Sequence, residues 1–230
     1  DEGAQPQLVL DDNANAAGHA YYSVSAWAVS PDGRQLAWAE DTSGRGVLTL
    51  RFKDLATGRV RSDVLPGVLD QLAWANDNRT LFFGELDATH RPHKLYRHTL
   101  GEPDAQLVFE ESDGRFCLHC YRASSERQLI LHLSSKTTSE VWVLDAATPL
   151  GEFSCIAARE EGHDYDIDHG LLGGEWRWLI RSNQSGINFA LYAVNESYTT
   201  GQVPTREHWQ VLIAHDPQVM LEGFSLNSSA

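Results

Sequence analysis

The sequence has few of the features that mark chains held by disulfides or embedded in membranes. Its 230 residues include three cysteines, too few for a disulfide framework and leaving one unpaired, so a reducing compartment is the simpler expectation. No apolar run approaches the roughly 18 residues that a membrane helix needs. The first residues, Asp1-Glu2-Gly3-Ala4-Gln5, are acidic and polar, unlike a secretory signal, and no initiator methionine precedes them. We therefore expect a cytoplasmic protein without a membrane partner, and a chain that is a piece of something longer.

Basic residues are scarce as well. Lys and Arg number 18 against 32 Asp and Glu, which gives a formal net charge of -14, and no basic stripe is visible. Binding to nucleic acid or to an anionic membrane surface needs clustered Lys and Arg, so neither is an expected partner. The acidic excess permits a cationic ligand, although solubility alone is the simpler explanation.

Helical periodicity is also missing, and an internal repeat stands in its place. The composition, 42% hydrophobic and 22% charged, is that of a globular protein, and no long stretch repeats at helical spacing. Segments 24–41 and 69–87 each contain an apolar alternating run, a turn and a second apolar run. Asp32 and Asp77 occupy the two turns and lie 45 residues apart. The chain is therefore expected to be nearly all β.

Two fainter copies, at 120–133 and 165–180, continue this repeat. A period of roughly 45–50 residues with four short strands in each unit is typical of β-propeller blades. We expect an all-β fold, a partial β-propeller with about four to five four-stranded blades of a ring that often has seven, in one domain over residues 1–230. The expected blades span about 21–66, 69–110, 115–158 and 163–215, and a further blade begins over 219–230.

Several segments occur in the order seen in one peptidase family. They include VSPDGRQLAWAED at 29–41, RPHKLYRHTLG at 91–101, SKTTSEVWVLDA at 135–146, REEGHDYDIDH at 159–169 and MLEGF at 220–224. From about residue 8 to residue 225 the chain closely resembles the propeller of oligopeptidase B, also called protease II, in the prolyl oligopeptidase group of serine peptidases. The segments at 91–101 and 135–146 are the most specific.

The resemblance implies a two-part enzyme. In that family, an α/β-hydrolase domain with a Ser-Asp-His triad cleaves peptides after Arg or Lys, and a seven-bladed propeller excludes large folded proteins. The implied partners of this chain are the α/β-hydrolase domain of the same parent chain and small basic peptides. The nucleophile elbow G-x-S-x-G is absent, since neither Ser43 nor Ser185 has glycines in register. We expect no catalytic residue, metal or cofactor in this chain, and no α/β-hydrolase domain within it.

The acidic run Glu110-Glu111-Ser112-Asp113 is the first candidate for a functional contact. It closes one expected blade and leads to the next, and such connections lie at the rim or mouth of a propeller. The resemblance therefore suggests Glu110, Glu111 and Asp113 as residues that attract a basic substrate or face the hydrolase domain. Arg91 and Arg97 are the possible basic partners. A solvated loop is the simpler interpretation of the run, because exposed ion pairs contribute only about 0–1 kcal/mol each.

Three other patterns have simple structural explanations. His163 and His169 would share one face of a strand and suggest a metal site, but they are too far apart to chelate one ion without help, and an ordinary polar strand explains them better. Cys117 and Cys120 have C-x-x-C spacing, yet they lie on a predicted strand, and only Cys155 is left for a second pair. The seven tryptophans recur on expected strands, as core residues do. They are Trp27, Trp38, Trp74, Trp142, Trp176, Trp178 and Trp209.

Two main functions remain open from the sequence, beside a third, a metal-dependent hydrolase that would use the segment 163–169 with His163 and His169. The first is a substrate-gating, size-filtering propeller of an oligopeptidase B-like serine peptidase, inactive by itself. The second is a stand-alone β-propeller that binds protein partners. The second predicts blades that close on themselves within the chain, whereas the repeat pattern continues to both ends.

Overall fold

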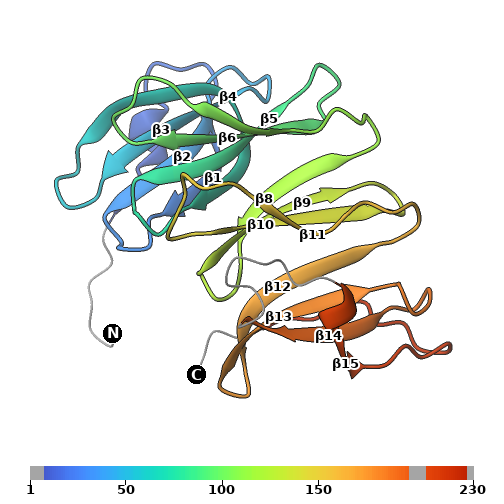
Figure 1. Ribbon diagram of the computed structural model, residues 1–230. Coiled ribbons are helices and arrows are strands. Elements are labelled where there is room, and N and C mark those ends of the chain that lie inside the picture. Colours follow the sequence, from blue (N-terminus) through green and yellow to red (C-terminus); the bar gives the residue numbers. More distant parts are fainter. Residues whose placement is uncertain (1–7, 197–205, 227–230) are drawn as a thin grey trace.

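The computed structural model describes residues 8–196 and 206–226, and nearly all of its regular structure is antiparallel β-strand (Figure 1). A short helix, α1 (Asp12–Asn15), precedes the strands, and a 3-10 turn, η2 (Arg206–His208), precedes the last of them. The strands are β1 (Ser23–Val29), β2 (Gln35–Asp41), β3 (Leu48–Asp54), β4 (Val60–Trp74), β5 (Thr80–Leu86), β6 (Pro92–Thr99), β7 (Gln106–Glu110), β8 (Cys117–Arg122), β9 (Gln128–Ser134), β10 (Ser139–Asp145), β11 (Ser154–Ala157), β12 (Tyr165–Leu172), β13 (Glu175–Ser182), β14 (Ala190–Asn195) and β15 (Gln210–Ile213).

Consecutive strands pair antiparallel and form four successive groups, which we call blades 1 to 4. Blade 1 contains β1, β2, β3 and the first part of β4, and blade 2 contains the rest of β4 with β5, β6 and β7. Strands β8 to β11 form blade 3, and β12 to β15 form blade 4. Figure 1 shows the blades following one another from the N-terminal to the C-terminal end. Together they form the expected all-β partial propeller.

Blades 1 and 2 share one strand, which the sequence pattern did not predict. The expected blade limits of 66 and 69 leave a break between two strands, whereas β4 runs unbroken from Val60 to Trp74. It pairs with β3 as far as Val68 and with β5 from Val68 onward. Gly67 has a positive φ of 77° close to this point, a conformation that glycine adopts without steric cost. One strand therefore serves as the last of blade 1 and the first of blade 2.

The hydrophobic core consists of layers between facing blades. Successive side chains of a strand point to opposite faces, so a strand between two neighbours is apolar on both sides. On β9, Leu129, Leu131 and Leu133 pack into the cluster shared with blade 2. Ile130, between them, packs into the cluster shared with blade 4. A third cluster joins blade 1 to blade 2 and contains Phe52 and other buried residues of both blades.

Hydrogen bonds between residues about one repeat apart connect neighbouring blades. The indole Nε1 of Trp74 donates to the main-chain oxygen of Ala28 at 3.1 Å, and Arg122 in turn donates to the main-chain oxygen of Trp74. The turns of blades 1 and 2 also meet, because the Asp32 amide donates to Asn78 Oδ1 at 2.8 Å. These partners lie 46 or 48 residues apart in the sequence. The repeat period is thus also the spacing of the bonds between blades.

The outer face of blade 4 is covered by the segment that was expected to begin another blade. Over residues 219–226 the structure has no strand, and residues 227–230 lie outside its described part. Leu221, Phe224 and Leu226 pack on buried Leu179 and Leu191 of this face. The apolar pattern of the segment is therefore used for packing against blade 4.

The tryptophans are mostly core residues, as predicted, with one clear exception. Trp38, Trp74, Trp178 and Trp209 are buried, whereas Trp27 on β1 is 69% exposed. Among the described residues, no strand precedes β1 that could cover this side of it. In the described residues, no helix is long and apolar enough to span a membrane.

Candidate interface site

The acidic run begins at Glu110, the last residue of β7 in blade 2, and continues into the connection to β8 of blade 3, and its three carboxylates have different surroundings. The Glu111 side chain is only 5% exposed, and it forms an ion pair with Arg159, which lies after β11. Arg159 also lies 3.6 Å above the ring centre of Phe116 and 3.6 Å from a Glu140 carboxylate oxygen. Glu111 is therefore a partner within the fold that ties this connection to blade 3.

Asp113 is bound by a neighbour in the same connection. Arg115 approaches its carboxylate to 2.8 Å and also donates its main-chain amide to it at 3.0 Å. The hydrogen bond from the Arg115 guanidinium lowers the pKa of Asp113 to about 2. Arg159 is more distant, at 3.9 Å. The Asp113 charge is thus already matched by nearby arginines.

Glu110 is the carboxylate of the run that faces solvent. Its side chain is 52% exposed, and the ammonium of Lys94 lies 3.8 Å away across the β6–β7 pair. Lys94 also lies 3.9 Å from Glu85, so its charge is shared between two carboxylates. Of the three acidic candidates, Glu110 has the weakest pairing within the chain and is the most accessible to another domain.

The Arg91 side chain binds main-chain oxygens of the acidic connection and not the carboxylates of Glu111 or Asp113. Its Nε donates to Asp87 at 2.9 Å. The two terminal nitrogens donate to the carbonyl oxygens of Glu111, Asp113 and Phe116 at 2.8–3.3 Å. Asp87 keeps the guanidinium in place, and hydrogen bonds from Thr89 lower the pKa of that carboxyl. Arg91 therefore orders the connection that follows Glu110.

Arg97 lies away from the acidic run. It donates to the side-chain oxygen of Gln106 at 2.9 Å and 3.0 Å. It also donates to the main-chain oxygens of Pro149 and Gly151, in the connection before β11, at 2.8 Å and 3.2 Å. This arginine links blade 2 to blade 3, and the structure does not bring it to Glu110, Glu111 or Asp113.

The two histidines that were considered as metal ligands, His163 and His169, have separate protein partners. Arg206 donates to His163 Nδ1 at 2.6 Å, and Ser182 Oγ lies 2.8 Å from its Nε2. His169 Nδ1 lies 2.8 Å from Ser125 Oγ. Burial, aided by nearby arginines, lowers the pKa of each histidine to about 4, so both are neutral at pH 7. In residues 8–196 and 206–226, no three His, Cys, Asp or Glu side chains are grouped as metal ligands.

The C-x-x-C pair is divided between two environments. Cys117 is exposed and Cys120 is buried, as expected for residues on opposite sides of a strand. Burial raises the pKa of the Cys120 thiol to about 12, and that of Cys155 likewise. Thiols with such raised pKa values are poor nucleophiles at neutral pH.

Arg159 and Phe116 are the residues of this site that the sequence analysis missed. Arg159 bonds to Glu111 across 48 residues of sequence, so no local pattern joins them. One signal was present in the sequence. Glu111 and Arg159 have opposite charges, each follows the last strand of its blade, and they are separated by about one repeat period.

Four antiparallel groups stacked face to face define this chain as a partial β-propeller. Its sequence matches, over residues 1–229, the family described as the N-terminal β-propeller domain of prolyl oligopeptidase, and the chain belongs to that family. The resemblance drawn from the sequence motifs is confirmed.

Relatives in this family are much longer than this chain. It is 37% identical over 227 residues to dipeptidyl aminopeptidase BI of Pseudoxanthomonas mexicana, covering 97% of this chain and 30% of that protein. It is 34% identical over 195 residues to protease 2 of Moraxella lacunata, covering 83% of this chain and 28% of that protein. Among solved structures, oligopeptidase B from Leishmania major matches with a TM-score of 0.77 and 26% identity, over 90% of this chain and 29% of that one. The chain therefore spans about 30% of the length of these relatives.

Proposed function

We propose that this chain forms part of the propeller of a serine oligopeptidase, in which an α/β-hydrolase domain of the same parent chain cleaves small peptides after Arg or Lys. The observation that carries the proposal is the likeness, along 90% of this chain, to oligopeptidase B from Leishmania major. The relative named protease 2 supports the same activity class. The propeller filters substrates by size and contributes no catalytic group.

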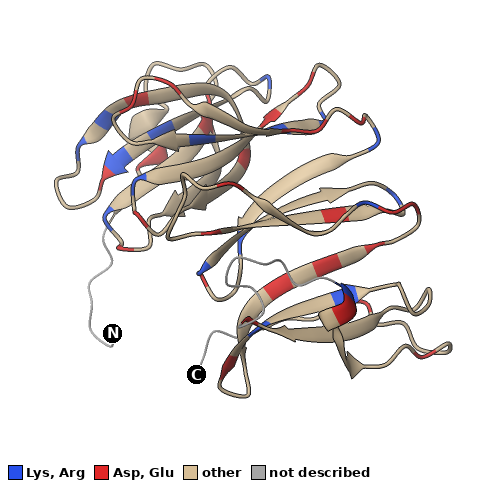
Figure 2. Ribbon diagram, viewed as in Figure 1, with Lys and Arg blue, Asp and Glu red and all other residues tan. Residues whose placement is uncertain are grey.

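The charge of the chain supports basic peptides as substrates. Figure 2 shows acidic residues in all parts of the fold, including alternate positions on β12, and the net charge is -14. A surplus of negative charge raises the local concentration of cationic ligands and speeds their encounter with the protein. The effect decreases with ionic strength, because salt screens charges beyond about 8 Å at 0.15 M.

The first experiment measures cleavage specificity with the complete gene product that contains this chain. Fluorogenic peptides that differ only in Arg, Lys, citrulline or Ala before the scissile bond are compared. We expect kcat/KM for Arg and Lys to exceed that for citrulline by about 100-fold or more, since a buried charge contact is lost with citrulline. Release of dipeptides only from free N-termini would instead indicate the activity named in the Pseudoxanthomonas relative. Absence of any hydrolysis would favour a protein-binding propeller.

The second experiment tests the size filter. One cleavable sequence is presented as a free ten-residue peptide and as an exposed loop of a stably folded carrier protein. The proposal predicts cleavage of the peptide and no cleavage of the folded carrier, with cleavage restored when the loop is excised. Equal rates on peptide and carrier would contradict filtering by the propeller.

The third experiment tests Glu110 as a contact to the hydrolase domain or to substrate. The substitution Glu110→Lys is compared with Glu102→Lys, which changes another exposed carboxylate in the same blade. One exposed ion pair is worth up to about 1 kcal/mol, so we expect kcat/KM to fall by about fivefold for Glu110→Lys only. The difference should disappear at high salt. An unchanged kcat/KM and salt dependence would remove Glu110 from the interface.

A further inference from the structure

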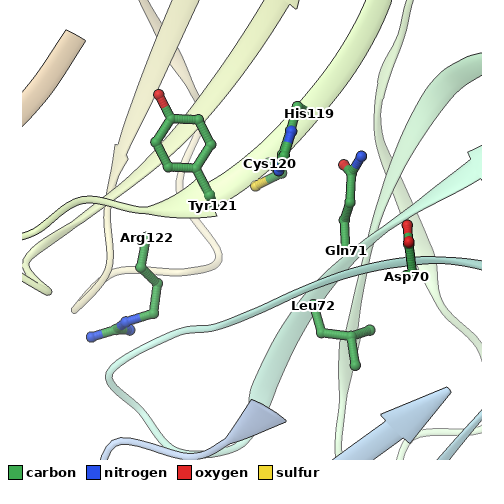
Figure 3. A pocket seen from close by; sticks show the side chains of 7 residues that line it. All are labelled: Asp70, Gln71, Leu72, His119, Cys120, Tyr121 and Arg122. Carbon is green, nitrogen blue, oxygen red and sulfur yellow. The ribbon is translucent and has the colours of Figure 1, made fainter. Parts of the chain in front are cut away.

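A groove runs between β4 and β8, the first strands of blades 2 and 3. First strands of adjacent blades border the central channel of a propeller, so a ligand in the channel can reach this groove. Its volume is about 490 Å³, enough for one large side chain. The lining residues are Asp70, Gln71, Leu72, His119, Cys120, Tyr121 and Arg122 (Figure 3).

A β-bulge turns two consecutive polar residues toward this groove. Val68 pairs with Glu85 and Leu72 with Phe83, so three residues of β4 lie opposite one residue, Gly84, of β5. In a regular strand, neighbouring side chains point to opposite faces, and a bulge removes that restriction. Figure 3 shows the side chains of Asp70 and Gln71 extending to the same side, next to His119.

The bulge depends on a small residue behind it. A Cβ atom on Gly84 would lie 2.6 Å from Leu69 Cδ1, closer than real side chains approach. Leu69 is buried in that space. Asp70 and Gln71 are therefore held at the groove by packing that leaves no room for a side chain at position 84.

The arginine and tyrosine donors that line the groove are already used. Arg122 points away from Asp70 and Gln71 in Figure 3 and donates to the main-chain oxygens of Trp74 and Glu126. The Tyr121 hydroxyl lies 3.3 Å from the main-chain oxygen of Ile167. An anionic ligand would find no free cation among these residues.

The acceptors, in contrast, remain available within the described part of the chain. Gln71 Oε1 is buried and has no hydrogen-bond partner there, which is unfavourable unless a ligand supplies a donor. Asp70 is exposed, and its side chain forms no hydrogen bond or ion pair with the described residues. Partial burial lowers the pKa of His119, so its ring is neutral at pH 7 and does not repel a cation.

A carboxylate and an amide oxygen whose side chains extend to the same side of a strand suit a planar cation with several N–H donors. Guanidinium has five donors in a rigid fork that matches this geometry, whereas an ammonium is a compact point charge. A divalent metal needs more oxygen ligands than the groove offers, and the described residues contain no group of three such ligands. We propose that this groove binds the guanidinium group of an arginine side chain through Asp70 and Gln71. The assignment of that arginine to a peptide in transit through the channel rests on the proposed function.

The test uses the complete gene product with its histidines labelled for NMR. The His119 ring signal, identified by its loss in His119→Gln, reports on the groove and not on a distant catalytic pocket. N-acetyl-arginine amide is titrated, with the citrulline and lysine analogues in parallel. We expect a saturable shift with the arginine compound and none with the citrulline compound. The lysine compound should bind at least about threefold more weakly, since it cannot engage both acceptors with one fork.

Two variants decide whether Asp70 is the anchor. Asp70→Asn should weaken binding of N-acetyl-arginine amide by about fivefold or more, because a charge-assisted contact becomes neutral. The matched control, Asp104→Asn, removes another exposed carboxylate and should leave the affinity unchanged. Equal affinity of wild type and Asp70→Asn, or of the arginine and lysine compounds, would refute the proposal.

The readout separates this proposal from the peptidase function. A His119 shift in a protein without peptidase activity would keep the groove and reject the proposed function. Peptidase activity after Arg with no His119 response to N-acetyl-arginine amide would reject the groove alone.

Discussion

Removal of one buried hydroxyl, that of Tyr165, should destabilise the contact between blades 3 and 4. The Tyr165 side chain extends from β12 to an irregular point in the β10–β11 pairing, where the register shifts between Val141 and Trp142. Its hydroxyl donates to the Ala157 carbonyl at 2.7 Å and accepts from the amides of Val141 and Ala157 at 2.8 Å and 3.2 Å. One hydroxyl thus satisfies three buried main-chain groups.

The expected magnitude follows from the groups left without a partner. In Tyr165→Phe the ring still packs against His163 and Trp209, so the loss is confined to hydrogen bonds. Two buried amides lose their acceptor, and each unsatisfied donor costs about 1–3 kcal/mol. We expect the free energy of unfolding to decrease by about 2–4 kcal/mol, because compensation by small shifts reduces the upper limit.

Urea unfolding, followed by tryptophan fluorescence, measures this loss. The midpoint should fall at an unchanged m-value, since the surface exposed on unfolding is the same. Tyr121→Phe is the matched control, because its hydroxyl makes one long bond of 3.3 Å to a carbonyl, and it should cost under about 1 kcal/mol. A loss below about 0.5 kcal/mol for Tyr165→Phe would refute the reasoning.

Three further predictions use the same unfolding measurement. Gly84→Ala should lower the free energy of unfolding by about 1–3 kcal/mol, because the new methyl group clashes with Leu69. In a Leu69→Ala background most of this loss should disappear, and simple additivity of the two substitutions would contradict the contact. Because the folded state holds the pKa of His163 and of His169 near 4, the unfolded chain takes up more protons below pH 6.5. Stability should fall between pH 7 and pH 5 by about 1 kcal/mol for each histidine after allowance for screening, and replacement of both by Gln should reduce this loss. Arg91→Met should cost about 1–3 kcal/mol by leaving main-chain oxygens unpaired, and a neutral outcome would show that water replaces the guanidinium.

The sequence was sufficient for the class of fold because the relevant signals are local. Alternating apolar residues over five to eight positions specify a half-buried or fully buried strand, and turn residues such as Asp32 and Asn78 separate the strands. The recurrence of this pattern at about 45 residues predicted blades, and the ordered motifs predicted the family that the comparison confirmed.

The roles of charged residues could not be predicted in the same way. Glu110, Glu111 and Asp113 are neighbours in sequence, yet one faces solvent, one is buried against Arg159, and one is paired with Arg115. Glu111 is buried because Arg159, 48 residues later, packs against it. That contact forms only when blade 3 has packed beside the connection that contains Glu111. The tertiary structure therefore separated the accessible carboxylate from the paired ones.

The sequence by itself determined the all-β class, the strand repeat and the family, since period-two patterns and turn chemistry act within a few residues. Only the tertiary structure decided that β4 belongs to two blades and that a bulge opposite Gly84 directs both Asp70 and Gln71 toward one groove. It also decided that Arg91 and Arg97 bind main-chain oxygens. The physical reason is distance along the chain. Partners in adjacent blades lie about one repeat apart, and their contacts exist only after the blades have packed face to face.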